Sequence, residues 1–306
     1  MVKKMRHWFM PGPLEEEPDD LPPGPRAEPP DTAVIDDWAK AEGVHAARLA
    51  GVAGRLGALD DRLLRGPEGW QYRLALIEAA DLSWFAGDRV SADRLALWVS
   101  MRLSGAQDDP NALARVGWAI RRLTGGPGPK GDLAAFLDRR DPDSIEDSAE
   151  RFEDRAGGWL HVMAAAANLH PITRACMGFH LWNLAGLAPL AMGGAGGLRA
   201  SGLPPERLAR WLDGMNSAIL TAMRNLDDTQ TWSARAEKVM SQLSGRTPAA
   251  LRSALTEWPL VSAPMAEVLT GASRAAVQRN LAWMEERGLI REVTQQGRFR
   301  MWRIKD

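Results

Sequence analysis

Apolar residues along this chain recur mostly at three- and four-residue steps, the period of an amphipathic helix. The clearest run starts at Pro204 and keeps one register to Leu226, and a weaker pattern extends it to Gly245 as one long helix or a pair. Its members are Leu208, Trp211, Leu212, Met215, Ile219, Met223 and Leu226. A second helical stretch before Gly66 carries Val34, Trp38, Leu49, Val52, Leu56 and Leu59. We therefore predict a mainly α protein with a helical-bundle body at 32–245.

Further helices are predicted inside this body. Ser91 is expected to cap one of them, and Asn111 precedes another that ends before the glycine- and proline-rich linker at 124–131. The most apolar stretch lies between Arg174 and Arg199. It is long enough to cross a bilayer, but Pro189 and a glycine cluster dilute its hydrophobicity. We expect its first part to be the buried central helix of the bundle, and no membrane insertion.

From residue 247 onwards, signals for helix starts and stops follow one another closely. The caps and first-turn residues are Thr247, Pro248, Ser262 and Ser273, and the stops are Pro259 and Gly271. They predict a first helix, a short second helix, a glycine-containing turn and a third helix over 273–287. This order is typical of a helix-turn-helix.

The third helix has two different sides. Val277, Leu281 and Met284 have the i, i+4, i+7 spacing of a buried stripe. The opposite side carries Arg274, Ala275, Gln278, Arg279, Ala282 and Glu286. Small residues permit close approach to a major groove, where arginine pairs with guanine and glutamine with adenine. We predict base contacts by Arg274, Gln278 and Arg279.

After Gly288, two short segments rich in β-branched and aromatic residues flank a turn at 294–297. They predict a two-stranded wing at 289–304. Alternation would place Phe299 and Met301 on one side and Arg298 and Arg300 on the other, although Trp302 falls on the arginine side. We predict that DNA phosphates are contacted by Ser273, Arg298 and Arg300.

Charge supports this division of the chain. Residues 247–306 carry nine Lys/Arg and six Asp/Glu, a net of +3, and the remainder carries a net of −4. The sequence thus predicts a winged helix-turn-helix at 246–306 that binds double-stranded DNA. Winged helices also serve as protein-docking or dimerisation modules, so this alternative stays open. The apolar stripe from Leu208 to Leu226 further predicts a homodimer through the helical body.

The run from Trp258 to Ile304 resembles the C-terminal domain of an uncharacterised family of alphaproteobacterial helix-turn-helix proteins, some of them plasmid-borne in rhizobia. The resemblance extends upstream over Ala58 to Leu103. It implies DNA binding, as a transcriptional regulator or a plasmid-maintenance factor. The run is more distantly similar to the winged helix that follows the catalytic domain in many Fic-type proteins.

The segment 169–187 is in turn similar to the core of Fic-type enzymes, which transfer AMP. His170, Pro171 and Arg174 match, but the acidic metal-binding position and the glycine-rich anion loop are absent. A pyrophosphate would have nothing to hold it. We therefore expect a Fic-like helical scaffold without this activity, so not an enzyme, and an active enzyme of Fic-like descent is the alternative.

Four residues are candidate metal ligands: His161, His170, Cys176 and His180. Their spacing matches no standard site, and core histidines are the favoured interpretation. We predict no metal and no cofactor. The single cysteine, Cys176, excludes an intramolecular disulfide and fits a cytoplasmic protein. Residues 1–31 are rich in proline and acidic residues, which predicts a disordered tail.

Overall fold

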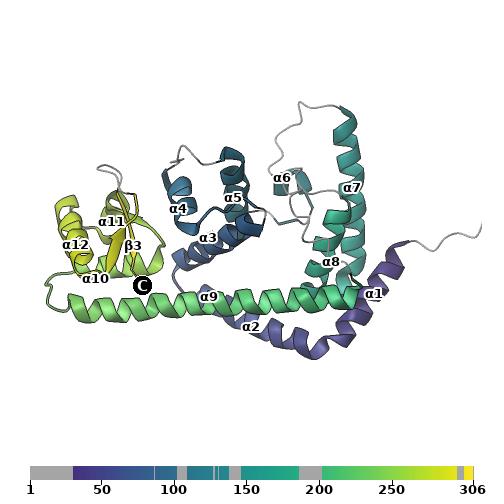
Figure 1. Cartoon of the computed structure of the whole chain (residues 1–306), viewed down its shortest axis with the longest axis horizontal. Helices are drawn as coiled ribbons and strands as arrows, with labels where there is room; N and C mark the ends of the chain where they lie inside the picture. Colours follow the sequence, from purple (N-terminus) through teal and green to yellow (C-terminus); the bar gives the residue numbers. More distant parts are fainter. Residues whose placement is uncertain are drawn as a thin grey trace, which may run out of the picture.

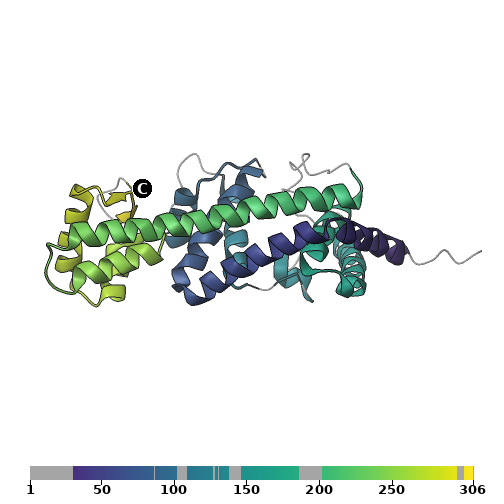
Figure 2. The ribbon, with the colours of Figure 1, turned by 90° about the horizontal axis from the view of Figure 1, so that it is seen from below.

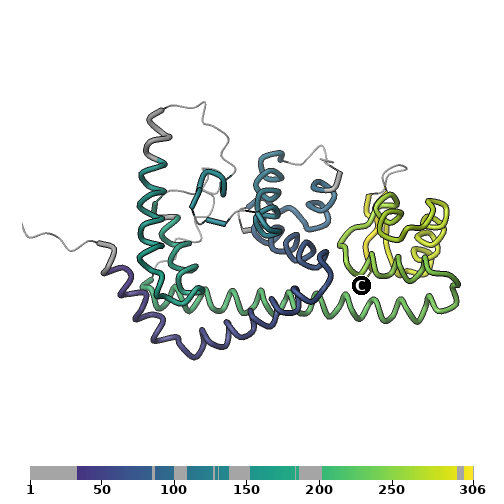
Figure 3. Tube along the Cα trace, turned by 180° about the vertical axis from the view of Figure 1, so that it is seen from behind, coloured from purple at the N-terminus to yellow at the C-terminus, as the bar shows by residue number. Residues whose placement is uncertain are grey.

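The computed structural model describes residues 30–85, 87–101, 109–126, 128–129, 131–137, 146–185, 202–294 and 300–305. Within these ranges the chain is mainly α-helical, as predicted. One helix, α9 (Pro204–Met240), runs along most of the molecule, and three groups of elements stand on it (Figure 1). They are α7 with α8 at one end, α3 to α5 in the middle, and the C-terminal elements at the other end (Figure 3).

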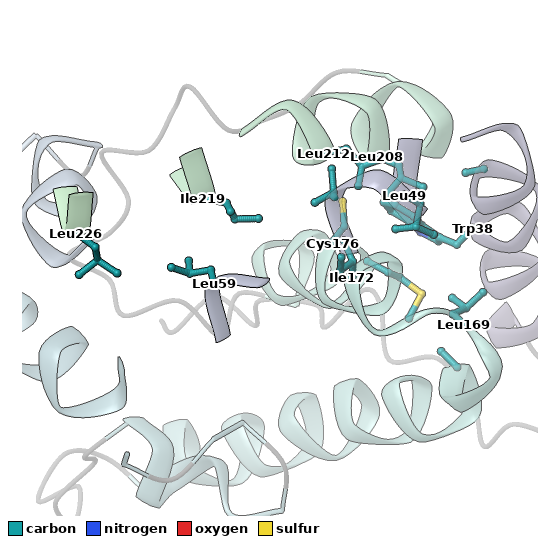
Figure 4. Close-up of a cluster of buried hydrophobic side chains, with 14 of the residues drawn as sticks. Trp38, Leu49, Leu59, Leu169, Ile172, Cys176, Leu208, Leu212, Ile219 and Leu226 are labelled. Carbon is teal, nitrogen blue, oxygen red and sulfur yellow. The ribbon is translucent and has the colours of Figure 1, made fainter. Parts of the chain in front are cut away.

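Helix α9 is a single element, where the sequence left one helix or a pair open. At 1.5 Å per residue, 37 residues span about 55 Å. Leu208, Leu212 and Leu226 are fully buried in the protein's own core, together with residues of α1, α2 and α8 (Figure 4). The apolar stripe from which we predicted a homodimer is therefore used within the chain, and a dimer would need another surface.

The helical stretch before Gly66 is divided at His45 into α1 (Pro30–Val44) and α2 (Ala46–Arg65). Both lie alongside α9 (Figure 2). His45 Nε2 lies 2.9 Å from the carbonyl oxygen of Pro205, at the start of α9. Two residues of the predicted stripe, Val34 and Leu56, are each 37% exposed. Of the predicted tail at 1–31, only the last two residues are described, and they begin α1.

The middle unit consists of α3 (Glu68–Phe85), α4 (Ala92–Met101) and α5 (Pro110–Leu123). Its helices share a core that contains Leu76, Leu95 and Leu113. The amide of Arg94 donates to Ser91 Oγ at 3.3 Å, so the predicted cap is confirmed. Helix α5 begins at Pro110, one residue before Asn111, and is capped by Asp109, whose side chain accepts from the amide of Asn111.

The group at the N-terminal end of α9 consists of α6 (Leu133–Leu137), α7 (Glu146–Ala165), a 3₁₀ turn (Ala166–Asn168) and α8 (Pro171–Leu184). The apolar helix α8 buries Ile172, Cys176 and Met177 against α9. Most of α8 is buried or half-buried, as predicted, but the helix that runs past all three groups of elements is α9 (Figure 1). None of the described helices is both long and apolar enough to cross a membrane.

The C-terminal unit (residues 247–305) has the order α10 (Thr247–Glu257), β1 (Val261–Ser262), α11 (Ala263–Thr270), α12 (Arg274–Glu286), β2 (Ile290–Glu292) and β3 (Met301–Ile304). Its three strands form an antiparallel sheet in the order β1-β3-β2. The core of the unit also takes in Trp232, Ala236 and Met240 from the last turns of α9. The unit is thus built on the end of the long helix.

Candidate nucleic-acid interface

Local signals position α11 and α12 much as predicted. Ser262 Oγ accepts from the amide of Met265, and Ser273 Oγ accepts from the amide of Ala276. Gly271 ends α11 in the left-handed region, at φ 63°, a conformation that costs glycine little. The predicted cap at Thr247 is wrong. Helix α10 begins at Thr247 itself, and Arg246 before it makes no side-chain cap.

Helix α12 has the two sides that its periodicity predicted. Val277, Leu281 and Met284 are fully buried in the core of the C-terminal unit. The residues on the opposite side are exposed: Ser273, Arg274, Ala275, Gln278, Arg279, Ala282 and Glu286. We refer to this set as the outward face of α12. It brings together all the predicted base contacts, and α12 lies at the outer end of the molecule (Figure 1).

The two arginines of the outward face differ in their surroundings. Arg274 Nε donates to Glu267 Oε1 of α11 at 2.8 Å, so its charge is paired. Arg279 has no ion-pair partner among the described residues. Gln278 lies between the two along the helix and carries an uncharged amide. Arg279 is therefore the cation of this face that is available to an external anion.

Strands β2 and β3 lie where the sequence predicted a two-stranded wing at 289–304, and β1 adds a third strand to their sheet. Arg298 and Phe299 lie outside the described residues. Arg300 is described and exposed, but its Nη2 donates to Glu285 Oε2 of α12 at 3.0 Å, and its guanidinium carbon lies 4.9 Å from the centre of the Trp302 ring. Arg300 is thus held between a carboxylate and an aromatic ring.

Residues 300–302 alternate as predicted, with Arg300 over the Trp302 ring, but both faces of the sheet are buried here. Met301 and Trp302 are adjacent in sequence, point to opposite faces of the sheet, and are both buried. Trp302 belongs to the core of the C-terminal unit, whereas Met301 and Leu260 belong to the core of the middle unit. The reason is that the sheet is covered on both faces, with the middle unit packed against the second one.

Polar contacts reinforce this packing, and sequence reasoning had missed them. Asp93, in the first turn of α4, accepts from Arg303 Nη1 of β3 at 2.7 Å and from Arg291 Nη2 of β2 at 3.1 Å. Nη2 of the buried Arg73 in α3 donates to carbonyl oxygens at the end of α10. These pairs join residues more than 180 positions apart, for which no local signal exists. Two cations of the sheet thereby share one carboxylate of the same chain.

The outer side of α11 carries exposed apolar side chains beside the Glu267–Arg274 pair. Val268 is 83% exposed and Leu269 is 44% exposed. Both follow the buried Ala266 on a helix of eight residues. Neither of these side chains offers a hydrogen-bond donor or a charge to a partner.

His170, one of the residues that matched the Fic core, has a structural role. His170 Nδ1 accepts from the amide of Ile172 at 3.1 Å and so caps α8, while the amide of His170 donates to Glu42 at 2.9 Å. The segment 186–201, in which an anion-binding loop would follow, lies outside the described residues. An AMP-transfer activity therefore stays an untested alternative.

The candidate metal ligands do not converge. No group of three or more His, Cys, Asp or Glu residues suited to a metal occurs in the described part of the chain. Burial raises the pKa of the Cys176 thiol to about 12, although the charge of Arg207 opposes this. His180 is buried and stacked on Trp38, and burial lowers its pKa, with Arg207 and Arg210 acting in the same direction. Both residues are core side chains of α8.

No family model matches the sequence, and no curated protein matches it. The resemblances to the alphaproteobacterial family and to Fic-type proteins therefore stay predictions that rest on the residues quoted for them.

Proposed function

We propose that the C-terminal unit is a winged helix-turn-helix and that the protein binds double-stranded DNA sequence-specifically, with α12 as the recognition helix. The observation that carries this proposal is the outward face of α12. Its N-terminal half exposes small, amide-bearing and cationic side chains, while the opposite stripe is completely buried. A transcriptional regulator or a plasmid-maintenance factor would use such a face.

The geometry of α12 suits a major groove for physical reasons. Ala275 and Ala282 allow the helix backbone to approach base edges closely. Gln278 can form two hydrogen bonds with adenine, and Arg279 can form two with guanine. Glu286 comes one turn after Ala282, where a straight helix leaves the groove. The order α10-β1-α11-α12-β2-β3 and its antiparallel sheet also support the assignment.

The test is a comparison of two DNA molecules. The preferred duplex is first selected from a random library with the full-length protein, and its affinity is then measured by fluorescence anisotropy beside that of a random duplex. Gln278→Ala or Arg279→Ala should cost about 1–3 kcal/mol on the preferred duplex, because a base-edge contact exists only with the right base. On the random duplex the cost of Gln278→Ala should be small.

Arg287→Ala is the matched control, because it removes one positive charge from the end of the same helix, where Arg287 stacks on Trp283 at 4.5 Å. It should not change the preference between the two duplexes. If folded Gln278→Ala and Arg279→Ala proteins bind both duplexes as the parent does, α12 does not read DNA.

A second candidate function, protein docking, is favoured by Val268 and Leu269. Exposed apolar residues rimmed by polar ones are typical of protein-interaction sites, and these two adjacent side chains lie beside the Glu267–Arg274 pair. If selection yields no preferred duplex, and Val268→Ser with Leu269→Ser abolishes co-purification of one defined partner from the host, the unit docks protein instead of DNA.

A further inference from the structure

Glu285 lies where the end of α12 meets the wing strand β3. Its Oε2 atom accepts from Arg300 Nη2 at 3.0 Å and from Trp302 Nε1 at 3.3 Å. The Arg300 side chain is 44% exposed and that of Glu285 is 33% exposed, so the pair lies at the surface. Trp302 beneath them is buried, which fixes one side of the cluster.

Three contacts therefore restrain the wing arginine at the same time. The carboxylate of Glu285 is anchored by the indole nitrogen of the buried Trp302, so it cannot swing away freely. The guanidinium of Arg300 is paired with that carboxylate and lies over the Trp302 ring. Because Glu285 supplies a full negative charge at hydrogen-bond distance, Arg300 presents little net charge to an external phosphate.

We propose that Glu285 is a positioning residue that withholds Arg300 from DNA phosphates and so lowers the affinity for DNA of any sequence. The inference rests on the proposed function. Sequence-independent affinity comes from neutralised phosphates, and each such contact releases counterions from DNA. With Arg300 held in this way, the preference for one DNA sequence over another depends on the outward face of α12, since phosphate contacts carry no sequence information.

The neighbouring residue provides a matched control. Glu286 is exposed, and it has no ion pair with any residue that the structure describes. Glu285→Gln and Glu286→Gln change the net charge by the same amount on the same helix turn. Only the first removes the charge that Arg300 is paired with. The amide oxygen of glutamine can still accept from Trp302 Nε1, so the packing of β3 is kept.

The experiment measures binding of the full-length protein to a random duplex by anisotropy across 0.05–0.3 M salt, about the range in which such contacts respond. Glu285→Gln should bind about three- to tenfold more tightly than the parent near 0.1 M salt, with a salt slope steeper by about one unit, the contribution of one added phosphate contact. Glu286→Gln removes the same charge without releasing an arginine, so it should change the affinity and the slope less than Glu285→Gln does.

Arg300→Ala gives a second readout. It should have little effect on the parent, but in the Glu285→Gln background it should remove the gain in affinity and in slope. Equal affinities and slopes for Glu285→Gln and Glu286→Gln, in a parent that binds DNA, would overturn this inference and leave the proposed function standing. If neither the parent nor Glu285→Gln binds either duplex, both proposals are wrong.

Discussion

Arg73 of α3 joins the middle unit to the C-terminal unit, and its replacement tests how firmly the two are held together. Its Nη2 atom donates to the carbonyl oxygens of Leu255 at 3.2 Å, Thr256 at 3.3 Å and Trp258 at 2.9 Å. Leu255 needs such a donor, because Pro259 stands four residues later and has no amide hydrogen. The buried guanidinium thus satisfies the C-terminal carbonyls of α10.

We expect Arg73→Met to lower the free energy of unfolding by about 3 kcal/mol. Each buried carbonyl left without a donor costs about 1–3 kcal/mol. Removing a cation from near a helix C-terminus costs about a further 0.3–1 kcal/mol of stability. The losses at the carbonyls and at the helix end do not add fully, because methionine also relieves the desolvation of a buried charge. Trp70 Nε1 continues to donate to Thr256 at 3.3 Å, which limits the loss further.

The assay is urea denaturation followed by circular dichroism, together with hydrogen exchange of the α10 amides. Exchange is needed because a chain of several units need not unfold in one step. Arg246→Met is the control, since it removes an exposed charge from the opposite end of α10. The reasoning is refuted if Arg73→Met has a free energy of unfolding no lower than that of Arg246→Met, and if the α10 amides exchange equally slowly in the two variants.

Two further predictions concern α8. Since the Cys176 thiol is buried and its pKa is raised to about 12, a maleimide should label it at pH 8 only after denaturation, and rapid labelling of the folded protein would contradict its burial. The pKa of His180 is lowered from the ordinary 6.5 by burial, so the unfolded chain binds more protons below that pH. The free energy of unfolding should therefore fall as the pH drops below about 6.5. His180→Phe should weaken this dependence, and an unchanged pH profile would count against the assignment.

Helices whose burial is one-sided could be predicted from the sequence. The stripe of Val277, Leu281 and Met284 repeats along α12 itself, so its neighbours in sequence reveal which side is buried. Ser273 and Gly271 mark the ends of their helices through hydrogen bonds and a backbone conformation that involve only nearby residues. The outward face of α12 followed directly from these local features.

Features that depend on contacts between units could not be predicted. Met301 and Trp302 are both buried because the sheet has a covered face on each side, which breaks the expected alternation of buried and exposed residues. Strand β1 has only two residues, too few for any periodicity. Asp93 and Glu285 form ion pairs with arginines of other elements. No local pattern reveals these pairs, so the arginines were counted as free cations from the sequence.

Because the C-terminal unit is attached to α9 and to the middle unit, the direction in which α12 points is fixed relative to the rest of the chain. The unit is held on α9, where Trp232 Nε1 donates to the carbonyl of Leu289 at 2.7 Å, and on the middle unit through Arg73 and Asp93. These contacts involve α10 and the sheet and leave the outward face of α12 exposed. A unit held in one orientation loses less rotational freedom on binding than a tethered one. Under the proposed function, two copies held in this way would read paired half-sites at a spacing set by contacts between whole chains.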